Sequence, residues 1–306
     1  MDTELARTFL TVIAAGNFIK ASERLHLTQS TVSARIRLLE EQLGRRLFIR
    51  NKAGTSLTPA GRAFQKHAST LVRTLEQARQ DAGVPRGFRA ALSIGARIGL
   101  WEDLLMDWLP VMRTDAPDVS IRAEIALEPE LMQGLIEGRL DIGVMYTPQS
   151  RPGLRVEPLL EEQLIMVTTG PEEPVAAGAP GGLGPDYVLV DWGPEFLAWH
   201  NTSFPDFDGP PIMANIGWIG LRHILAAGGT GYFPERLVRP HLAAGRLVRR
   251  TDAPDFTLPA YVVWSPDGDA ALAEFALDRL RAIVDRGILP IEAKQTPAPE
   301  TGQGRR

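Results

Sequence analysis

Apolar residues recur at helical spacing near the start of the chain. A first amphipathic helix is predicted near residues 3–15, where these apolar side chains share one face: Leu5, Phe9, Val12 and Ile13. Gly16 predicts its end, because glycine readily adopts the left-handed conformation that follows a helix. A second short helix is predicted over residues 18–25, and His26 with Leu27 forms the next turn.

A third helix is predicted from Gln29 to about Leu43, and Gly44 ends it. Thr28 suits the N-cap, because its hydroxyl can accept a hydrogen bond from a backbone N–H of the first turn. The predicted buried stripe consists of Val32, Ile36, Leu39 and Leu43. The opposite face begins with uncharged polar residues, namely Gln29, Ser30 and Ser33.

Two helices joined by a tight turn, the second with a polar start, suit insertion into the major groove of DNA. Glutamine can form a paired hydrogen bond with adenine, and serine can donate to or accept from several bases. Arginine beside such a helix favours phosphate. The residues predicted to contact DNA from this segment are Thr28, Gln29, Ser30, Thr31, Ser33, Arg35 and Arg37.

A hairpin is predicted next, with strands at residues 47–50 and 56–58 around the turn Asn-Lys-Ala-Gly. Such a hairpin is typical of the wing of a DNA-binding domain. Arg50 and Lys52 near its tip would reach the phosphate backbone or the minor groove.

A long helix is predicted from Pro59 to about Ala82, with Thr58 as its cap. Its apolar residues alternate at spacings of four and three: Phe64, Ala68, Leu71, Leu75, Ala78 and Ala82. This seam favours pairing with a helix of a second subunit, because the helix exceeds the usual length of roughly 8–20 residues. The alternative is packing against the body of the same chain.

Strands and helices alternate after a hinge at residues 83–91. The first predicted unit has strands at 91–97, 119–126 and 140–146 with helices at 101–113 and 129–137. This order predicts a parallel sheet covered by helices. A second unit begins near 163–170 and adds strands at 187–191, 211–215 and 231–237 and a helix at 217–227. A strand at 259–265 and a helix near 268–286 then follow.

Open α/β sheets bind ligands beyond the carboxyl ends of their strands. Arg97 could pair there with a carboxylate, whereas Asp191 and Glu195 favour a cationic or hydroxylated ligand. The alternative is that the aromatic residues nearby belong to the core and that the acidic residues cap helices. The candidate effector-contacting residues are Arg97, Ile98, Gly99, Trp101, Leu127, Glu128, Asp191, Trp192, Glu195, Phe196, His200, Trp218, Gly229 and Thr230.

Composition excludes several classes of protein. The apolar fraction of 44% and the charged fraction of 23% are those of a globular protein. No run approaches the roughly 18 apolar residues of a membrane span, and the N-terminus lacks the features of a signal peptide. The absence of cysteine excludes disulfides and fits a cytoplasmic location.

Charge is distributed unevenly along the chain. Residues 1–90 contain 15 Lys and Arg against 7 Asp and Glu, a net charge of +8. The remaining residues contain 18 against 30, a net charge of -12. This asymmetry indicates that the first part binds a polyanion and the second does not.

Catalytic and metal sites are not predicted. The five histidines are not spaced as metal ligands, and no phosphate-binding loop or nucleophile elbow occurs. His200 lies nine residues after Asp191, but nothing places a nucleophile beside it. We therefore expect no cofactor and no enzymatic activity.

The segment "TFLTVIAAGNFIKASERLHLTQSTVSARIRLLEEQLGRRLFIRNKAGTSLTPAG" resembles the winged helix-turn-helix of LysR-type transcriptional regulators. The later segments "EGRLDIGVMY" and "AAGGTGYFPE" resemble the periplasmic-binding-protein-like effector domain of that family. Two shorter segments, "LSIGARIGLWE" and "DWGPEF", resemble its HdfR-like subgroup. The resemblance implies base contacts at Gln29, Ser30 and Ser33. It also implies a homodimer or homotetramer, double-stranded DNA and a small-molecule effector as partners, and RNA polymerase as a candidate partner.

The expected architecture is a winged helix-turn-helix with a linker helix, followed by an α/β effector domain of two Rossmann-like subdomains. The expected domains are 1–58 for DNA binding, 59–87 for the linker and hinge, and 88–292 for effector binding, followed by a disordered tail at 293–306. Within the effector domain, subdomain I covers about 88–161 and 266–292, and subdomain II about 162–265. The effector is expected between them. The alternative function is an α/β binding protein or enzyme with an accessory nucleic-acid-binding domain.

Overall fold

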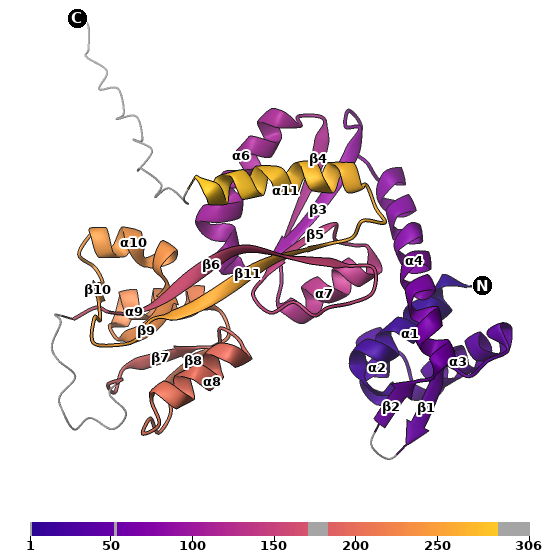
Figure 1. The fold of residues 1–306 in the computed structure, drawn as a ribbon, viewed down its shortest axis with the longest axis horizontal. Coiled ribbons are helices and arrows are strands. Elements are labelled where there is room, and N and C mark those ends of the chain that lie inside the picture. The colour runs from indigo at the N-terminus through magenta and orange to yellow at the C-terminus, as the bar shows by residue number, and fades with distance from the viewer. Residues whose placement is uncertain (1, 52–53, 171–182, 287–306) are drawn as a thin grey trace, which may run out of the picture. The chain divides into compact units, whose positions relative to one another are not determined.

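The structure, a computed structural model, describes residues 2–51, 54–170 and 183–286 (Figure 1). These residues divide into two compact units. Unit 1 comprises residues 2–101, 109–161 and 259–279, and unit 2 comprises the other described residues. The predicted tail at 293–306 lies outside the described residues. None of the described helices is both long and apolar enough to cross a bilayer.

The N-terminal part of unit 1 is a winged helix-turn-helix. Its elements are α1 (Thr3–Ala15), α2 (Phe18–Leu25), α3 (Gln29–Leu43), β1 (Phe48–Asn51), β2 (Gly54–Leu57) and α4 (Pro59–Ala82). Side chains of Asp2, Asn17 and Thr28 cap the first three helices by accepting a backbone N–H. β1 and β2 form the predicted antiparallel hairpin.

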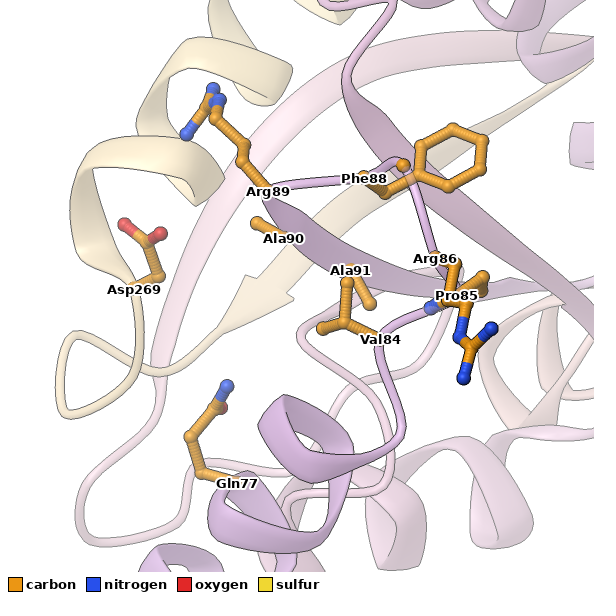
Figure 2. A pocket seen from close by; sticks show the side chains of 10 residues that line it. Gln77, Val84, Pro85, Arg86, Phe88, Arg89, Ala90, Ala91 and Asp269 are labelled. Carbon is orange, nitrogen blue, oxygen red and sulfur yellow. The ribbon is translucent and has the colours of Figure 1, made fainter.

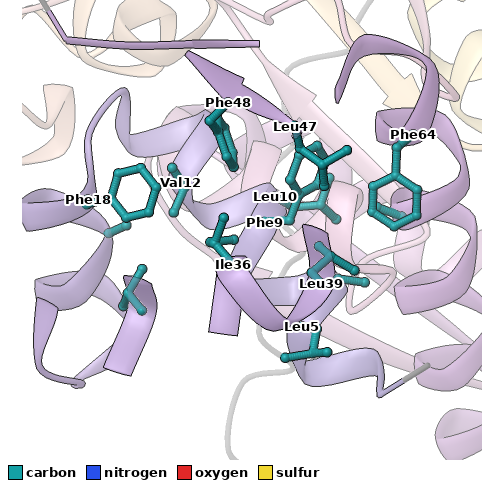
Figure 3. Packing of buried hydrophobic residues seen from close by; sticks show 14 of the residues in the cluster. Leu5, Phe9, Leu10, Val12, Phe18, Ile36, Leu39, Leu47, Phe48 and Phe64 are labelled. Atoms are coloured by element: carbon teal, nitrogen blue, oxygen red, sulfur yellow. The ribbon is translucent and has the colours of Figure 1, made fainter. Parts of the chain in front are cut away.

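Four phenylalanines lie in the core of this domain: Phe9, Phe18, Phe48 and Phe64 (Figure 3). The ring of Phe9 lies 5.2 Å from the ring of Phe48 and 5.2 Å from that of Phe64, measured between centroids. Val32, Ile36 and Leu39 of α3 join this core with no exposed surface. Leu43, also predicted to be buried, is 37% exposed because α3 extends beyond the core at its C-terminal end.

The apolar seam of α4 is divided between two environments. Phe64, Ala68 and Val72 pack into the core of their own domain, which agrees in part with the alternative of packing within the chain. Leu71 is 38% exposed and Ala78 is also exposed. One side of α4 therefore packs internally, and the other keeps apolar surface open.

Four strands of unit 1 form a sheet in the order β4 (Val119–Ile125), β3 (Ala90–Ala96), β5 (Ile142–Met145) and β11 (Phe256–Trp264). β3 is parallel to β4 and β5, as predicted, but β11 is antiparallel to β5. The parallel sheet predicted for the first three strands is therefore present, and β11, whose direction was not predicted, joins it as an antiparallel strand. The helical segments that follow β3, β4 and β11 are α5 (Ile98–Leu100), the π-helical turn η1 (Trp101–Leu105), α6 (Met106–Asp115), α7 (Glu128–Glu137) and α11 (Ala270–Asp285).

Unit 2 also contains a mixed sheet, in the order β6 (Arg155–Thr168), β9 (Thr230–Pro234), β7 (Tyr187–Val190) and β8 (Ile212–Ala214). β7 is parallel to both β8 and β9, whereas β6 is antiparallel to β9 and to the short β10 (Val248–Arg249). Its helices are α8 (Pro194–Ser203), α9 (Gly217–Ala227) and α10 (Glu235–Ala243). Both β6 and β11 are divided between the units, since the boundaries fall after residues 161 and 258.

Candidate nucleic-acid interface and effector loops

The exposed side of α3 begins with polar residues. Gln29 and Ser30 are exposed, Ser33 is half-buried and Arg37 is exposed. Gln29, Ser33 and Arg37 follow one another at intervals of four, so they share one side of the helix. Because the buried stripe of α3 faces the phenylalanine core, this polar side is open to a partner outside the protein.

Hydroxyl groups fix the start of α3. The Thr28 hydroxyl accepts from the backbone N–H of Thr31 at 3.2 Å and lies 2.8 Å from the hydroxyls of both Ser30 and Thr31. Thr28 and Thr31 therefore hold the helix terminus, and the amide of Gln29 projects from a rigid first turn.

The predicted cations fall into different environments. Arg35 lies on the other flank of α3, where its guanidinium pairs with Glu4 at 3.3 Å and donates to the Thr8 hydroxyl at 3.3 Å. It therefore helps to dock α3 on α1, which differs from its predicted role at DNA. The backbone of Arg50 belongs to β1, and Lys52 lies outside the described residues.

Two further cations were missed in the sequence, although they form an obvious pair. Arg45 and Arg46 are exposed between α3 and β1. With Arg37 they line a cavity of about 800 Å³ beside the wing. Glu40 and Glu41 line the same cavity, and the three exposed arginines supply the positive charge that suits a phosphate backbone.

In unit 1, two predicted effector residues pair with each other. The Arg97 guanidinium lies 2.9 Å from the Glu128 carboxylate, and both side chains are largely buried. Arg97 precedes Ile98 and Gly99 at the end of β3, and Leu127 and Glu128 begin α7 after β4. The predicted partner of Arg97, a ligand carboxylate, would therefore have to compete with Glu128.

Four predicted aromatic contacts lie in the interior instead of facing solvent. Trp101 is buried and donates its indole N–H to the Glu124 carbonyl at 2.9 Å. Trp192 donates in the same way to the Tyr232 carbonyl at 3.0 Å. Phe196 and His200 are at most 1% exposed. These four residues are buried in the two units, which agrees with the alternative that the aromatic residues belong to the core.

The remaining predicted residues of unit 2 lie on its turns and surface. The Asp191 carboxylate accepts the Gly193 N–H at 2.9 Å, and Glu195 is exposed in the first turn of α8. Gly229 has φ +130°, and a Cβ there would lie 2.5 Å from the Asp186 carbonyl oxygen, so the turn requires glycine. The Thr230 hydroxyl bonds to that of Thr168 at 3.2 Å.

Trp218 is 43% exposed and lines a cavity of about 660 Å³ within unit 2. Arg222 lies over its ring at 5.8 Å from the centroid. Glu102, His241 and Arg246 also line this cavity. Burial lowers the pKa of His241, and the charge of Arg246 lowers it further.

No group of three His, Cys, Asp or Glu that could hold a metal ion occurs among residues 2–51, 54–170 and 183–286.

The buried His200 makes unit 2 sensitive to acid. Its Nε2 lies 2.9 Å from the Tyr187 hydroxyl, and burial lowers the pKa of His200. As the pH falls, the imidazole of His200 therefore takes up a proton in the unfolded chain before it does so in the folded protein, starting near pH 6.5. The free energy of unfolding is highest above that pH and decreases as the pH falls below it. We expect urea unfolding of unit 2 to show this loss and His200→Gln to reduce it. His67→Gln, at an exposed histidine, is the control. If the free energy of unfolding depends equally on pH in the wild-type protein, in His200→Gln and in His67→Gln, the assignment to His200 is contradicted.

Comparison with known proteins agrees with this architecture. Residues 3–62 match the family described as "Bacterial regulatory helix-turn-helix protein, lysR family", and residues 85–183 match "LysR substrate binding domain". Proteins named HTH-type transcriptional regulator HdfR from Yersinia enterocolitica and Yersinia pestis are 31% identical over 280 residues, covering 88% of this chain and 92% of each relative. The chain belongs to the LysR family of transcriptional regulators.

This LysR-type regulator shares its fold with solved structures. ArgP from Mycobacterium tuberculosis matches with a TM-score of 0.56 and 24% identity, over 92% of this chain and 97% of that one. Full-length OxyR from Pseudomonas aeruginosa matches with a TM-score of 0.55 and 22% identity, over 92% and 95%. The predicted family and its likeness to HdfR are confirmed. The LysR-type chain is a DNA-binding regulator and not an enzyme.

Proposed function

We propose that two copies of this regulator insert α3 into consecutive major grooves of an imperfect inverted repeat, about one helical turn or a multiple apart. Gln29, Ser30 and Ser33 select the sequence, and Arg37, Arg45, Arg46, Arg50 and Lys52 supply phosphate contacts. The observation that carries this proposal is the polar start of α3, which lies opposite the buried residues Val32, Ile36 and Leu39.

The proposed assembly is a homodimer or homotetramer in the cytoplasm. Leu71 and Ala78 of the predicted seam remain exposed on α4, and this supports pairing with the same helix of a second copy. RNA polymerase is the proposed partner at the promoter. The proposed domains are 1–58 for DNA binding, 59–87 for the linker and hinge, and 88–292 for effector binding.

The proposed effector binds at the ends of β3 and β4, where Arg97 and Glu128 meet. This pair offers both donors and acceptors, so a small polar molecule with an acidic and a basic group fits better than a simple carboxylate. A thermal-shift screen of amino acids and simple carboxylates tests this. The proposal would be contradicted if simple carboxylates stabilise the protein, amino acids do not, and Glu128→Gln leaves this result unchanged.

A gel shift with duplex DNA from upstream of the protein's own gene tests DNA recognition. Affinity is expected to fall steeply with salt, because binding releases counterions from the phosphates. Ser33→Arg is expected to change the preference among mutated sites by about 1–3 kcal/mol for each base that is no longer recognised. Thr70→Arg, which adds the same charge at an exposed position on α4, is the control. Unchanged preference in Ser33→Arg across the panel of sites would refute the assignment.

A further inference from the structure

Arg73 is a buried cation in the middle of the linker helix α4. Its side chain is 7% exposed, and one guanidinium nitrogen donates to the Gly153 carbonyl at 3.1 Å and to the Asp267 carboxylate at 3.3 Å. Both partners belong to the α/β part of unit 1. Arg73 therefore connects the linker helix directly to the effector-binding part of the chain.

Two glycines make room for this side chain. A Cβ on Gly138 would lie 2.6 Å from Cγ of Arg73, and a Cβ on Gly153 would lie 3.0 Å from its Nη2. Both glycines have positive φ, +76° and +82°, a conformation that other residues rarely adopt. The backbone of the α/β part is thus shaped as a socket for Arg73.

The socket lies where two strands begin and end. Gly153 is two residues before β6, and Asp267 is three residues after β11. The Ser265 hydroxyl donates to the same Gly153 carbonyl at 3.1 Å, which joins the two segments to each other. β6 and β11 are divided between the two units, and Arg73 bonds to the segments that lie next to their ends in unit 1.

Two other contacts join the α/β part of unit 1 to the winged helix-turn-helix. Ile136 of α7 packs against the winged-helix core, and Arg7 of α1 lies 3.8 Å from Glu137. Towards the C-terminal end of α4, a cavity of about 550 Å³ opens between Gln77, the hinge and Asp269 (Figure 2). Arg73 lies one helical turn before Gln77, the residue of α4 that lines this cavity.

Stability alone does not account for an arginine here. Its Nε is buried without a hydrogen-bond partner among the described residues, and burial lowers the pKa of Arg73 although Asp267 opposes this. A well-packed apolar side chain often stabilises such a position as well as a buried ion pair does. The Arg73 guanidinium bonds to two separate segments, at Gly153 and at Asp267. This favours a role in fixing the position of these segments relative to α4.

We propose that Arg73 is a positioning residue that couples the ends of β6 and β11 to the linker helix, and so transmits movement of the effector-binding part to the DNA-binding domain. This inference rests on the proposed function, in which an effector controls DNA binding. The coupling itself is a property of unit 1 and can be measured without an effector.

The test is a double-mutant cycle in the full-length protein. Gly153→Ala pushes a methyl group towards Arg73 and so perturbs the end of β6. With Arg73 present, we expect about tenfold faster amide exchange in α4 around residues 70–79 and a change of similar size in affinity for the upstream duplex. In the Arg73→Gln background, Gly153→Ala is expected to leave both quantities unchanged.

Arg79→Gln is the matched control on the same helix, because the Arg79 side chain is 59% exposed. Arg73→Gln alone should accelerate exchange in α4 and in residues 147–154, and Arg79→Gln should not. Equal effects of Gly153→Ala in both backgrounds, or identical exchange in Arg73→Gln and Arg79→Gln, would overturn the inference. Failure of the wild-type protein to bind DNA would instead overturn the proposed function, while the exchange data would still decide the coupling.

Discussion

Replacing Phe9 by alanine is expected to abolish DNA binding by unfolding the winged helix-turn-helix. The ring is fully buried and contacts two other phenylalanine rings, so its removal leaves a cavity at the centre of the domain. Truncation of a buried phenylalanine costs about 3–5 kcal/mol. That is a large part of the roughly 5–15 kcal/mol that holds a typical domain folded.

Circular dichroism during urea unfolding, together with the gel shift, measures this effect. Ile19→Ala is the control, because Ile19 belongs to α2 but is 58% exposed. We expect Ile19→Ala to bind DNA normally and to change stability by less than about 0.5 kcal/mol. Normal binding by Phe9→Ala would show that the aromatic cluster does not hold α3 in place.

Replacing Glu162 by alanine is expected to destabilise unit 2 by about 3–5 kcal/mol, because it removes a carboxylate that pairs with a buried arginine. The Glu162 carboxylate lies 2.5 Å from the Arg236 guanidinium, and both side chains are at most 5% exposed. Arg236 also donates to the Glu102 backbone carbonyl, so it cannot turn towards solvent without breaking that bond. Rearrangement therefore does not recover the attraction that the substitution removes.

The neighbouring Glu161 provides the control, since it is exposed on the same strand. Glu161→Ala should leave the urea midpoint nearly unchanged. The double variant Glu162→Leu with Arg236→Met should recover most of the stability, because paired apolar residues can replace a buried ion pair. A double variant as unstable as Glu162→Ala would show that shape, and not unpaired charge, causes the loss.

Local signals explain why the N-terminal domain was predictable from sequence. Asn17 and Thr28 cap their helices with side-chain oxygens, and Gly16 and Gly44 end them in the left-handed conformation. Each of these residues acts on backbone groups within four positions of itself, so its effect can be predicted without knowledge of the fold.

Strand direction and charge pairing were not predictable in the same way. The apolar run of β11 is the same whether the strand is parallel or antiparallel to β5, since alternation does not encode direction. Arg35 bonds to Glu4 and Arg97 to Glu128, each across 31 positions of the chain. Such partners are found only when the tertiary fold brings them together, and they changed the predicted roles of both arginines.

The phenylalanine core of the winged helix-turn-helix has a spectroscopic consequence. All six tryptophans and all four tyrosines of the chain lie beyond residue 100, so this domain contains neither. Intrinsic tryptophan fluorescence therefore reports on the rest of the protein and does not report directly on the winged helix-turn-helix. A single indole introduced at exposed Ile19 would give that part an optical reporter, leaving Phe9, Phe48 and Phe64 untouched.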